Sequence, residues 1–165
     1  MSDILHKVGI KASSSVDAYH ALSTIEGLAG WWTHDTQGES RVGGILKFRF
    51  GAGGFDMKVL ELDPAKRVLW QVVDGPEEWV GTMVSFDPKQ EGDWTIVLFK
   101  HQGWNEPVEF MHYCSTKWGA FSAEPEVVSR IRKSCSLAER NQARQLGIKR
   151  YLPTGRNDDL PDWNA

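Results

Sequence analysis

The sequence predicts an α+β fold in which a curved antiparallel sheet of six or seven strands wraps around one long C-terminal helix. Residues 107–121 carry apolar side chains at helical spacing, which is typical of an amphipathic helix. Nearly everything before residue 107 consists of short apolar stretches separated by turn residues, which is typical of an antiparallel meander. A helix with so aromatic a face needs an apolar partner, and the sheet is the partner that the rest of the chain offers.

The N-terminal region predicts one strand followed by two short helices. Residues 5–11 alternate between apolar and polar side chains, as a half-buried strand does. Ser14, with Asp17 three residues later, resembles the capping box that begins a helix. A second helix is expected to begin at Thr24, whose hydroxyl can accept a hydrogen bond from the first turn. The apolar faces expected for these helices are Val16, Tyr19 and Leu22 in the first, and Ile25, Leu28 and Trp31 in the second.

The remaining strands lie between clear turn signals. Residues 34–44 are polar and rich in glycine, which predicts a short strand and a turn. Residues 51–54, Gly-Ala-Gly-Gly, predict a hairpin turn that needs positive φ. Asp63 and Pro64 begin another tight turn. The other strands expected are residues 45–50, 55–62, 67–73, 79–87 and 94–101.

The last predicted element of the domain is the helix over residues 107–121. Pro107 fits its first turn, where a backbone N–H is not needed. Glu109 places a negative charge near the positive end of the helix dipole. The apolar face expected for this helix is Met111, Cys114, Trp118 and Phe121. We therefore expect one domain over residues 1–121 that includes the first half of this helix.

The composition of the chain excludes several classes of partner. The 165 residues carry a formal net charge of -3 with no basic block, which argues against nucleic acid and anionic membranes. No apolar stretch approaches the about 18 residues of a membrane span, so no membrane insertion is expected. The N-terminal sequence does not resemble a signal peptide. Cys114 and Cys135 are expected to be free thiols in a reducing cytosol, so we expect a cytoplasmic protein.

Several short stretches carry a family resemblance when they are taken in order. They are residues 29–32 (AGWW), 42–44 (VGG), 59–64 (VLELDP), 67–70 (RVLW), 95–104 (TIVLFKHQGW) and Trp118. Together they resemble the START-like (SRPBCC) superfamily, and more narrowly the bacterial single-domain homologues of the activator of the heat-shock protein ninety ATPase (AHSA-type). The resemblance covers residues 4–121. It implies a helix-grip fold with two small helices after the first strand and an apolar cavity between the sheet and the C-terminal helix.

Apolar side chains of the sheet and the C-terminal helix would line the cavity that the resemblance implies. The residues expected to bind the ligand are Trp31, Phe48, Phe50, Met57, Trp70, Phe86, Val97, Phe99, His101, Met111 and Trp118. The alternative is that these side chains fill the core and that no ligand exists. His101 would either orient a ligand at the cavity mouth or, as the favoured interpretation, be a structural histidine bonded to a neighbouring strand.

The function expected from the sequence is non-catalytic binding of a small apolar molecule, without a cofactor. The five histidines lack the spacing of a metal site, and Cys114 has no evident general base, so no metal-binding or catalytic residue is predicted. One alternative is a cyclase or hydrolase on a polyketide-like substrate, using His101 with Tyr113 or Glu61. Another is a co-chaperone that stimulates a heat-shock ATPase, although the separate N-terminal domain of the eukaryotic activators is missing. We also allow for a weak homodimer.

Residues 122–165 depart from the family pattern and are expected to form an atypical helix and a flexible tail. Pro125 falls where the family's helix continues, and a proline inside a helix costs about 3 kcal/mol, so a break is expected there. We hypothesise that a reading-frame shift produced this tail, because its codons, read one base later, can spell an ending close to the family's. A natural or added tail is the alternative. A coding DNA whose shifted frame does not spell that ending would refute the hypothesis.

Overall fold

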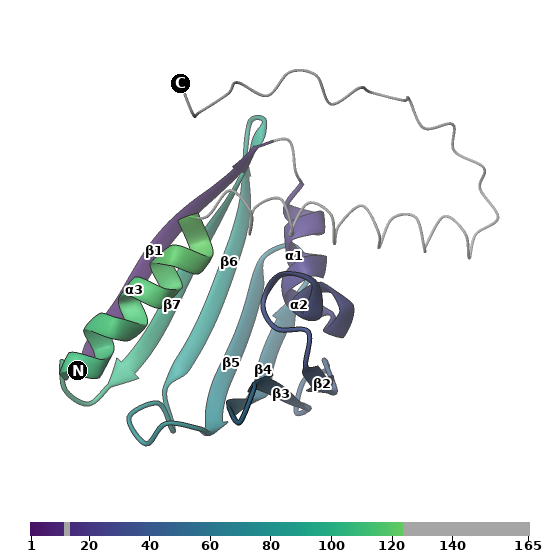
Figure 1. Cartoon of the computed structure of the whole chain (residues 1–165). Helices are drawn as coiled ribbons and strands as arrows, with labels where there is room; N and C mark the ends of the chain where they lie inside the picture. Colours follow the sequence, from purple (N-terminus) through teal and green to yellow (C-terminus); the bar gives the residue numbers. More distant parts are fainter. Residues whose placement is uncertain (12–13, 124–165) are drawn as a thin grey trace, which may run out of the picture.

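The computed structural model describes residues 1–11 and 14–123. The strands are β1 (Ser2–Lys11), β2 (Thr36–Gly38), β3 (Ile45–Phe50), β4 (Gly53–Asp63), β5 (Arg67–Asp74), β6 (Met83–Glu91) and β7 (Trp94–Trp104). The helices are α1 (Ser15–Ser23), α2 (Ile25–Trp31) and α3 (Glu109–Ala123). All seven strands form one antiparallel sheet in the order β1-β7-β6-β5-β4-β3-β2, which confirms the predicted α+β architecture (Figure 1).

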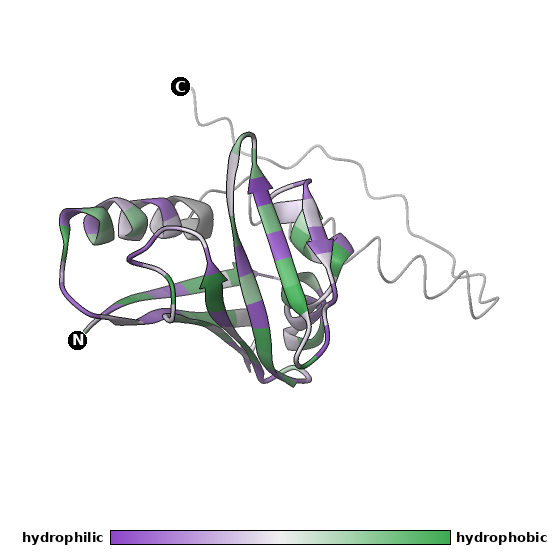
Figure 2. Ribbon diagram, turned by 90° about the horizontal axis from the view of Figure 1, so that it is seen from below, coloured by the Kyte–Doolittle hydropathy of each residue, from purple (hydrophilic) through white to green (hydrophobic). Residues whose placement is uncertain are grey.

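The sheet is strongly bent, and α3 lies over its concave face along β1 and β7 (Figures 1 and 2). Hydrophobic and hydrophilic residues alternate along the strands, as expected for a sheet with one buried face (Figure 2). β4 carries two register shifts against β5, between Asp56 and Met57 and between Val59 and Glu61. Such irregularities increase the twist and bend of a strand. They allow the β3–β4 hairpin to curl toward the side of the sheet that α3 covers.

The caps of α1 and α2 confirm the predicted helix starts. Ser14 Oγ accepts a hydrogen bond from the backbone N–H of Asp17 at 3.1 Å. The Asp17 carboxylate accepts one from the backbone N–H of Ser14 at 3.2 Å, which completes the capping box. Thr24 Oγ1 accepts a hydrogen bond from the backbone N–H of Gly27 at 3.0 Å and caps α2.

The buried face of α1 differs from the predicted one. Val16 is 51% exposed, whereas α1 buries Ala18, Ala21 and Leu22. α2 packs so closely against α1 that a Cβ on Gly27 would lie 2.7 Å from Ala21 Cα. The contact between α1 and α2 therefore requires small side chains. Hydrophobic periodicity alone had favoured the larger Val16 for the buried face of α1.

The largest difference from the predicted strands lies between β5 and β6. A strand was expected from residue 79, but β6 begins at Met83 and residues 75–81 form a loop. The backbone N–H of Trp79 donates to the carbonyl of Pro76 at 2.9 Å, which closes a turn. Gly75 has a φ of +142°, and a Cβ there would lie 2.7 Å from the Cβ of Phe55. Glycine thus allows this loop to approach β4 closely.

Helix α3 begins at Glu109, so Pro107 precedes the helix instead of lying in its first turn. Cys114 and Trp118 are buried, and the half-buried Met111 packs against the core, as the predicted apolar face requires. The Phe121 side chain lies outside the described part of the chain, as do residues 124–165 with the break and tail predicted for them. Among the helices that the structure describes, none is long and apolar enough to cross a membrane.

Candidate ligand-binding pocket

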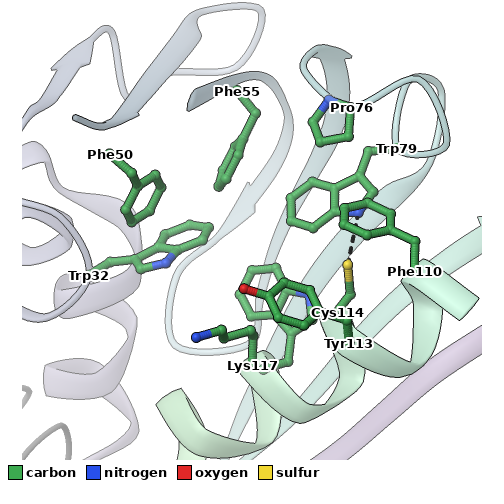
Figure 3. A pocket seen from close by; sticks show the side chains of 10 residues that line it. Trp32, Phe50, Phe55, Pro76, Trp79, Phe110, Tyr113, Cys114 and Lys117 are labelled. Carbon is green, nitrogen blue, oxygen red and sulfur yellow. Dashed lines mark hydrogen bonds between the residues drawn. The ribbon is translucent and has the colours of Figure 1, made fainter. Parts of the chain in front are cut away.

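A pocket of about 350 Å³ lies between α3, the loop over residues 75–81, the β3–β4 hairpin and the end of α2 (Figure 3). Seven of the ten side chains that line it are aromatic. The lining residues are Trp32, Phe50, Phe55, Pro76, Trp79, Phe110, Tyr113, Cys114, Lys117 and Trp118. The volume falls inside the range of about 300–1,000 Å³ that is usual for small-molecule sites.

One wall of the pocket is a stripe along α3. Phe110, Tyr113, Cys114, Lys117 and Trp118 are spaced by three or four residues, and helical geometry places such residues on one face. The rings of Phe110 and Tyr113 stack with centroids 6.2 Å apart. Tyr113 is 58% exposed and forms part of the rim, while Trp118 is buried at the base of the stripe.

Trp79 forms the opposite wall. Its ring centroid lies 4.9 Å from that of Phe55 and 6.1 Å from that of Trp118. Its indole N–H donates a hydrogen bond to Cys114 Sγ at 3.3 Å, which fixes the ring against α3 (Figure 3). Burial raises the pKa of the Cys114 thiol above its ordinary value; the hydrogen bond from Trp79 opposes this rise in part, and the nearby charge of Glu78 adds to it. The thiol is therefore protonated at neutral pH.

Trp32, at the C-terminal cap of α2, closes the pocket on the side of the β3–β4 hairpin. Its ring centroid lies 5.1 Å from that of Trp118 and 5.4 Å from that of Phe55. The neighbouring Trp31 turns toward α1 and donates its indole N–H to the carbonyl of Ala21 at 2.9 Å. Only the second residue of the Trp31–Trp32 pair therefore lines the pocket.

His101 is fully buried and joins three elements through hydrogen bonds. Its Nδ1 accepts from the indole N–H of Trp118 at 3.3 Å, so Nε2 is assigned the proton and donates to Thr82 Oγ1 at 2.8 Å. The Thr82 hydroxyl donates onward to the carbonyl of Trp79 at 2.6 Å. Burial lowers the pKa of His101 to about 4, so the ring is neutral at pH 7. These hydrogen bonds fix two elements to the sheet: α3 and the loop over residues 75–81, which we call the Trp79 loop.

Of the eleven predicted ligand-binding residues, Phe50 and Trp118 line the pocket. Phe50 is 42% exposed and lies at the rim. The others, which do not line this pocket, are Trp31, Phe48, Met57, Trp70, Phe86, Val97, Phe99, His101 and Met111. They belong to the packed core or lie against it.

Eight lining residues were missing from the prediction, and part of this set carries a sequence signal. Phe110, Tyr113 and Lys117 follow helical spacing beside the predicted face of α3. Trp79 was assigned to a strand, so its place in a loop over the pocket had no signal. Trp31 and Trp32 are the same residue type at adjacent positions in the sequence. The point at which α2 ends decides that the Trp32 side chain, and not that of Trp31, faces the pocket.

A family model described as "Activator of Hsp90 ATPase homolog 1-like protein" matches residues 13–124. The chain belongs to this family. The resemblance found in the sequence is therefore confirmed. Among solved structures, the Aha1 dimer from Colwellia psychrerythraea is 45% identical with a TM-score of 0.67. The alignment covers 73% of this chain and 90% of that chain.

More distant structures share the fold of this Activator of Hsp90 ATPase homolog 1-like domain. A protein from Bacillus halodurans is 22% identical with a TM-score of 0.61, over 82% of this chain and 97% of that chain. CalU16 from Micromonospora echinospora is 15% identical with a TM-score of 0.59, over 82% and 84%. No curated protein matches the chain significantly.

Within residues 1–11 and 14–123, no group of His, Cys, Asp and Glu side chains could hold a metal ion.

Proposed function

We propose that this chain binds a small aromatic molecule in the pocket beneath α3 and does not transform it. The observation that carries the proposal is the pocket itself, with about 350 Å³ of space and seven aromatic side chains around it. Aromatic walls favour a flat apolar ligand, because aromatic rings stack with centroids about 4.5–7 Å apart. Such stacking removes water from the ring of the ligand and from the ring of the protein. The open rim at Phe50 and Tyr113 gives such a ligand a route of entry.

The chemistry of the lining residues favours binding over catalysis. Cys114 is the only thiol among them, and its pKa is raised, which disfavours the reactive thiolate. Its sulfur accepts a hydrogen bond from Trp79 and, among the described residues, has no histidine bonded to it. Both ring nitrogens of His101 are engaged by Trp118 and Thr82, so this histidine supports the helix instead of acting as a base.

Stimulation of a heat-shock ATPase is the alternative function that the family description supports. ATPase assays with a purified heat-shock ATPase would distinguish it, since a pure ligand-binding protein would leave the turnover rate unchanged.

A weak homodimer also remains part of the proposal, supported by the relative described as a dimer. Sedimentation velocity at rising protein concentration tests that part, and a constant monomer mass would contradict it.

The neutral fluorophore N-phenyl-1-naphthylamine is expected to bind this protein saturably at one site. Its emission should rise and the tryptophan emission should fall, because Trp32, Trp79 and Trp118 line the pocket. Phe110→Ala removes one aromatic ring from the wall formed by α3. It should weaken binding by about tenfold, corresponding to about 1.4 kcal/mol of binding free energy.

Trp94→Ala is the matched control for this titration, because Trp94 is also a partly exposed aromatic residue but lies outside the lining set. This variant should bind the fluorophore with unchanged affinity. Absence of saturable binding to the parent protein, or equal weakening by Phe110→Ala and Trp94→Ala, would contradict the proposed function.

A further inference from the structure

Lys117 is the one charged side chain among the ten that line the pocket. It extends from α3 into the gap between Tyr113 and Trp32 (Figure 3). Its ammonium lies 5.4 Å from the centroid of the Tyr113 ring, at the distance of a cation–π contact. The pocket therefore combines an apolar interior with one positive charge near its rim.

Lys117 differs from several other cations of the domain in having no carboxylate partner among the described residues. Arg49 Nη1 lies 2.6 Å from the Asp56 carboxylate, and Lys89 Nζ lies 2.6 Å from Glu91. No ion pair within 4.0 Å forms at Lys117 in the part of the chain that the structure describes. As far as residues 1–11 and 14–123 are concerned, its charge can therefore pair with a ligand without the loss of an existing ion pair.

We infer that the ligand of this pocket is an aromatic anion, with its carboxylate, sulfonate or phosphate group paired to Lys117. This inference rests on the proposed function and adds the charge of the ligand to it. An ammonium beside aromatic walls is less screened than one in open water, which strengthens its attraction to an anionic group. The exposed position of Lys117 limits the gain to that of a partly exposed ion pair.

The distribution of charge also predicts how the ligand is oriented. Glu78 directly precedes Trp79, whose indole N–H donates to Cys114 Sγ at 3.3 Å, so its negative charge lies toward the Cys114 end of the pocket. An anionic group at that end of the pocket would be repelled, whereas Lys117 attracts it one helical turn further along α3. The rings of the ligand are therefore placed against Trp79 and Phe110, and the anionic group lies at the rim beside Lys117.

A pair of probes separates this inference from the proposed function. N-phenyl-1-naphthylamine is neutral, and 8-anilinonaphthalene-1-sulfonate carries the same ring system with a sulfonate. Lys117→Gln should weaken binding of the sulfonate about fivefold more than binding of the neutral probe, as expected for the loss of a partly exposed ion pair. Lys117→Arg should retain most of the sulfonate affinity, because it keeps the charge. Raising the salt concentration should weaken sulfonate binding to the parent protein more than to Lys117→Gln.

Lys58→Gln is the matched control, because Lys58 is an exposed lysine of β4 outside the lining set, and it should change neither affinity. If the neutral probe binds and Lys117→Gln leaves the sulfonate affinity unchanged, the inference is overturned while the proposed function stands. Equal weakening of both probes would also overturn it, because Lys117 would then act through packing of its stem. If neither probe binds the parent protein, the proposed function and the inference fall together.

Discussion

Replacement of Trp118 by alanine is expected to lower the free energy of unfolding by about 3–5 kcal/mol, the usual cost of deleting a buried tryptophan. Trp118 is 4% exposed, and its ring centroid lies 4.5 Å from that of Phe99 and 5.1 Å from that of Trp32. Its indole N–H also satisfies Nδ1 of buried His101. The variant therefore loses ring packing and leaves a buried acceptor without its donor. Most of the cooperative thermal transition should disappear.

Tyr113→Ala provides the matched control on the same helix, because Tyr113 is 58% exposed and its ring stacks only at the rim of the pocket. This variant should lose less than about 1 kcal/mol, as is usual for surface substitutions. Urea unfolding followed by circular dichroism measures both. Equal, small losses in the two variants would show that α3 does not dock through Trp118.

Acidification from pH 6.5 to pH 4 is expected to remove about 3 kcal/mol of stability through His101 alone. The pKa of His101 falls from an ordinary 6.5 to about 4 in the folded protein, because the ring is buried. In this window the unfolded chain binds a proton at His101 and the folded chain does not. Stability therefore rises with pH from about 4 to 6.5, and the contribution is lost as the pH falls.

The variant His101→Gln isolates this contribution from that of the carboxylates, which also titrate near pH 4. It should be less stable than the parent protein at pH 7, but its stability should fall less steeply below pH 6.5. His20→Gln removes an exposed histidine and should keep the slope of the parent protein. Denaturant unfolding at several pH values gives the comparison. Identical slopes for the parent protein and His101→Gln would mean that His101 is not buried in its neutral form.

Much of the fold could be predicted because local sequence signals agree with the final packing. The alternation that places Leu46 and Phe48 on one side of β3 matches their burial in the core. The cap residues Ser14 and Thr24 begin α1 and α2 as their hydrogen-bonding chemistry requires. Prediction failed at residues 79–82, because apolar side chains in a loop that folds onto the core look like the start of a strand.

The pocket was harder to predict, because its walls meet only in the folded chain. Phe48 and Phe50 share one face of β3, yet Phe48 is buried in the core while Phe50, at the hairpin end, reaches the rim. The choice between Trp31 and Trp32 depends on where α2 ends, and helix ends are the least predictable part of an element. Lys117 was not among the predicted site residues, since its position beside the pocket follows from the approach of α3 to Trp32.

The central claim, that a ligand occupies the space between α3 and the Trp79 loop, is tested most directly by NMR of the indole N–H groups during titration with N-phenyl-1-naphthylamine. The indole signals of Trp32 and Trp79 should shift and saturate at one equivalent, because both rings line the pocket. The signals of Trp70 and Trp104, which are buried in the core and do not line the pocket, should move little. Shifts centred on Trp70 and Trp104, or no saturable shift at Trp79, would contradict the account.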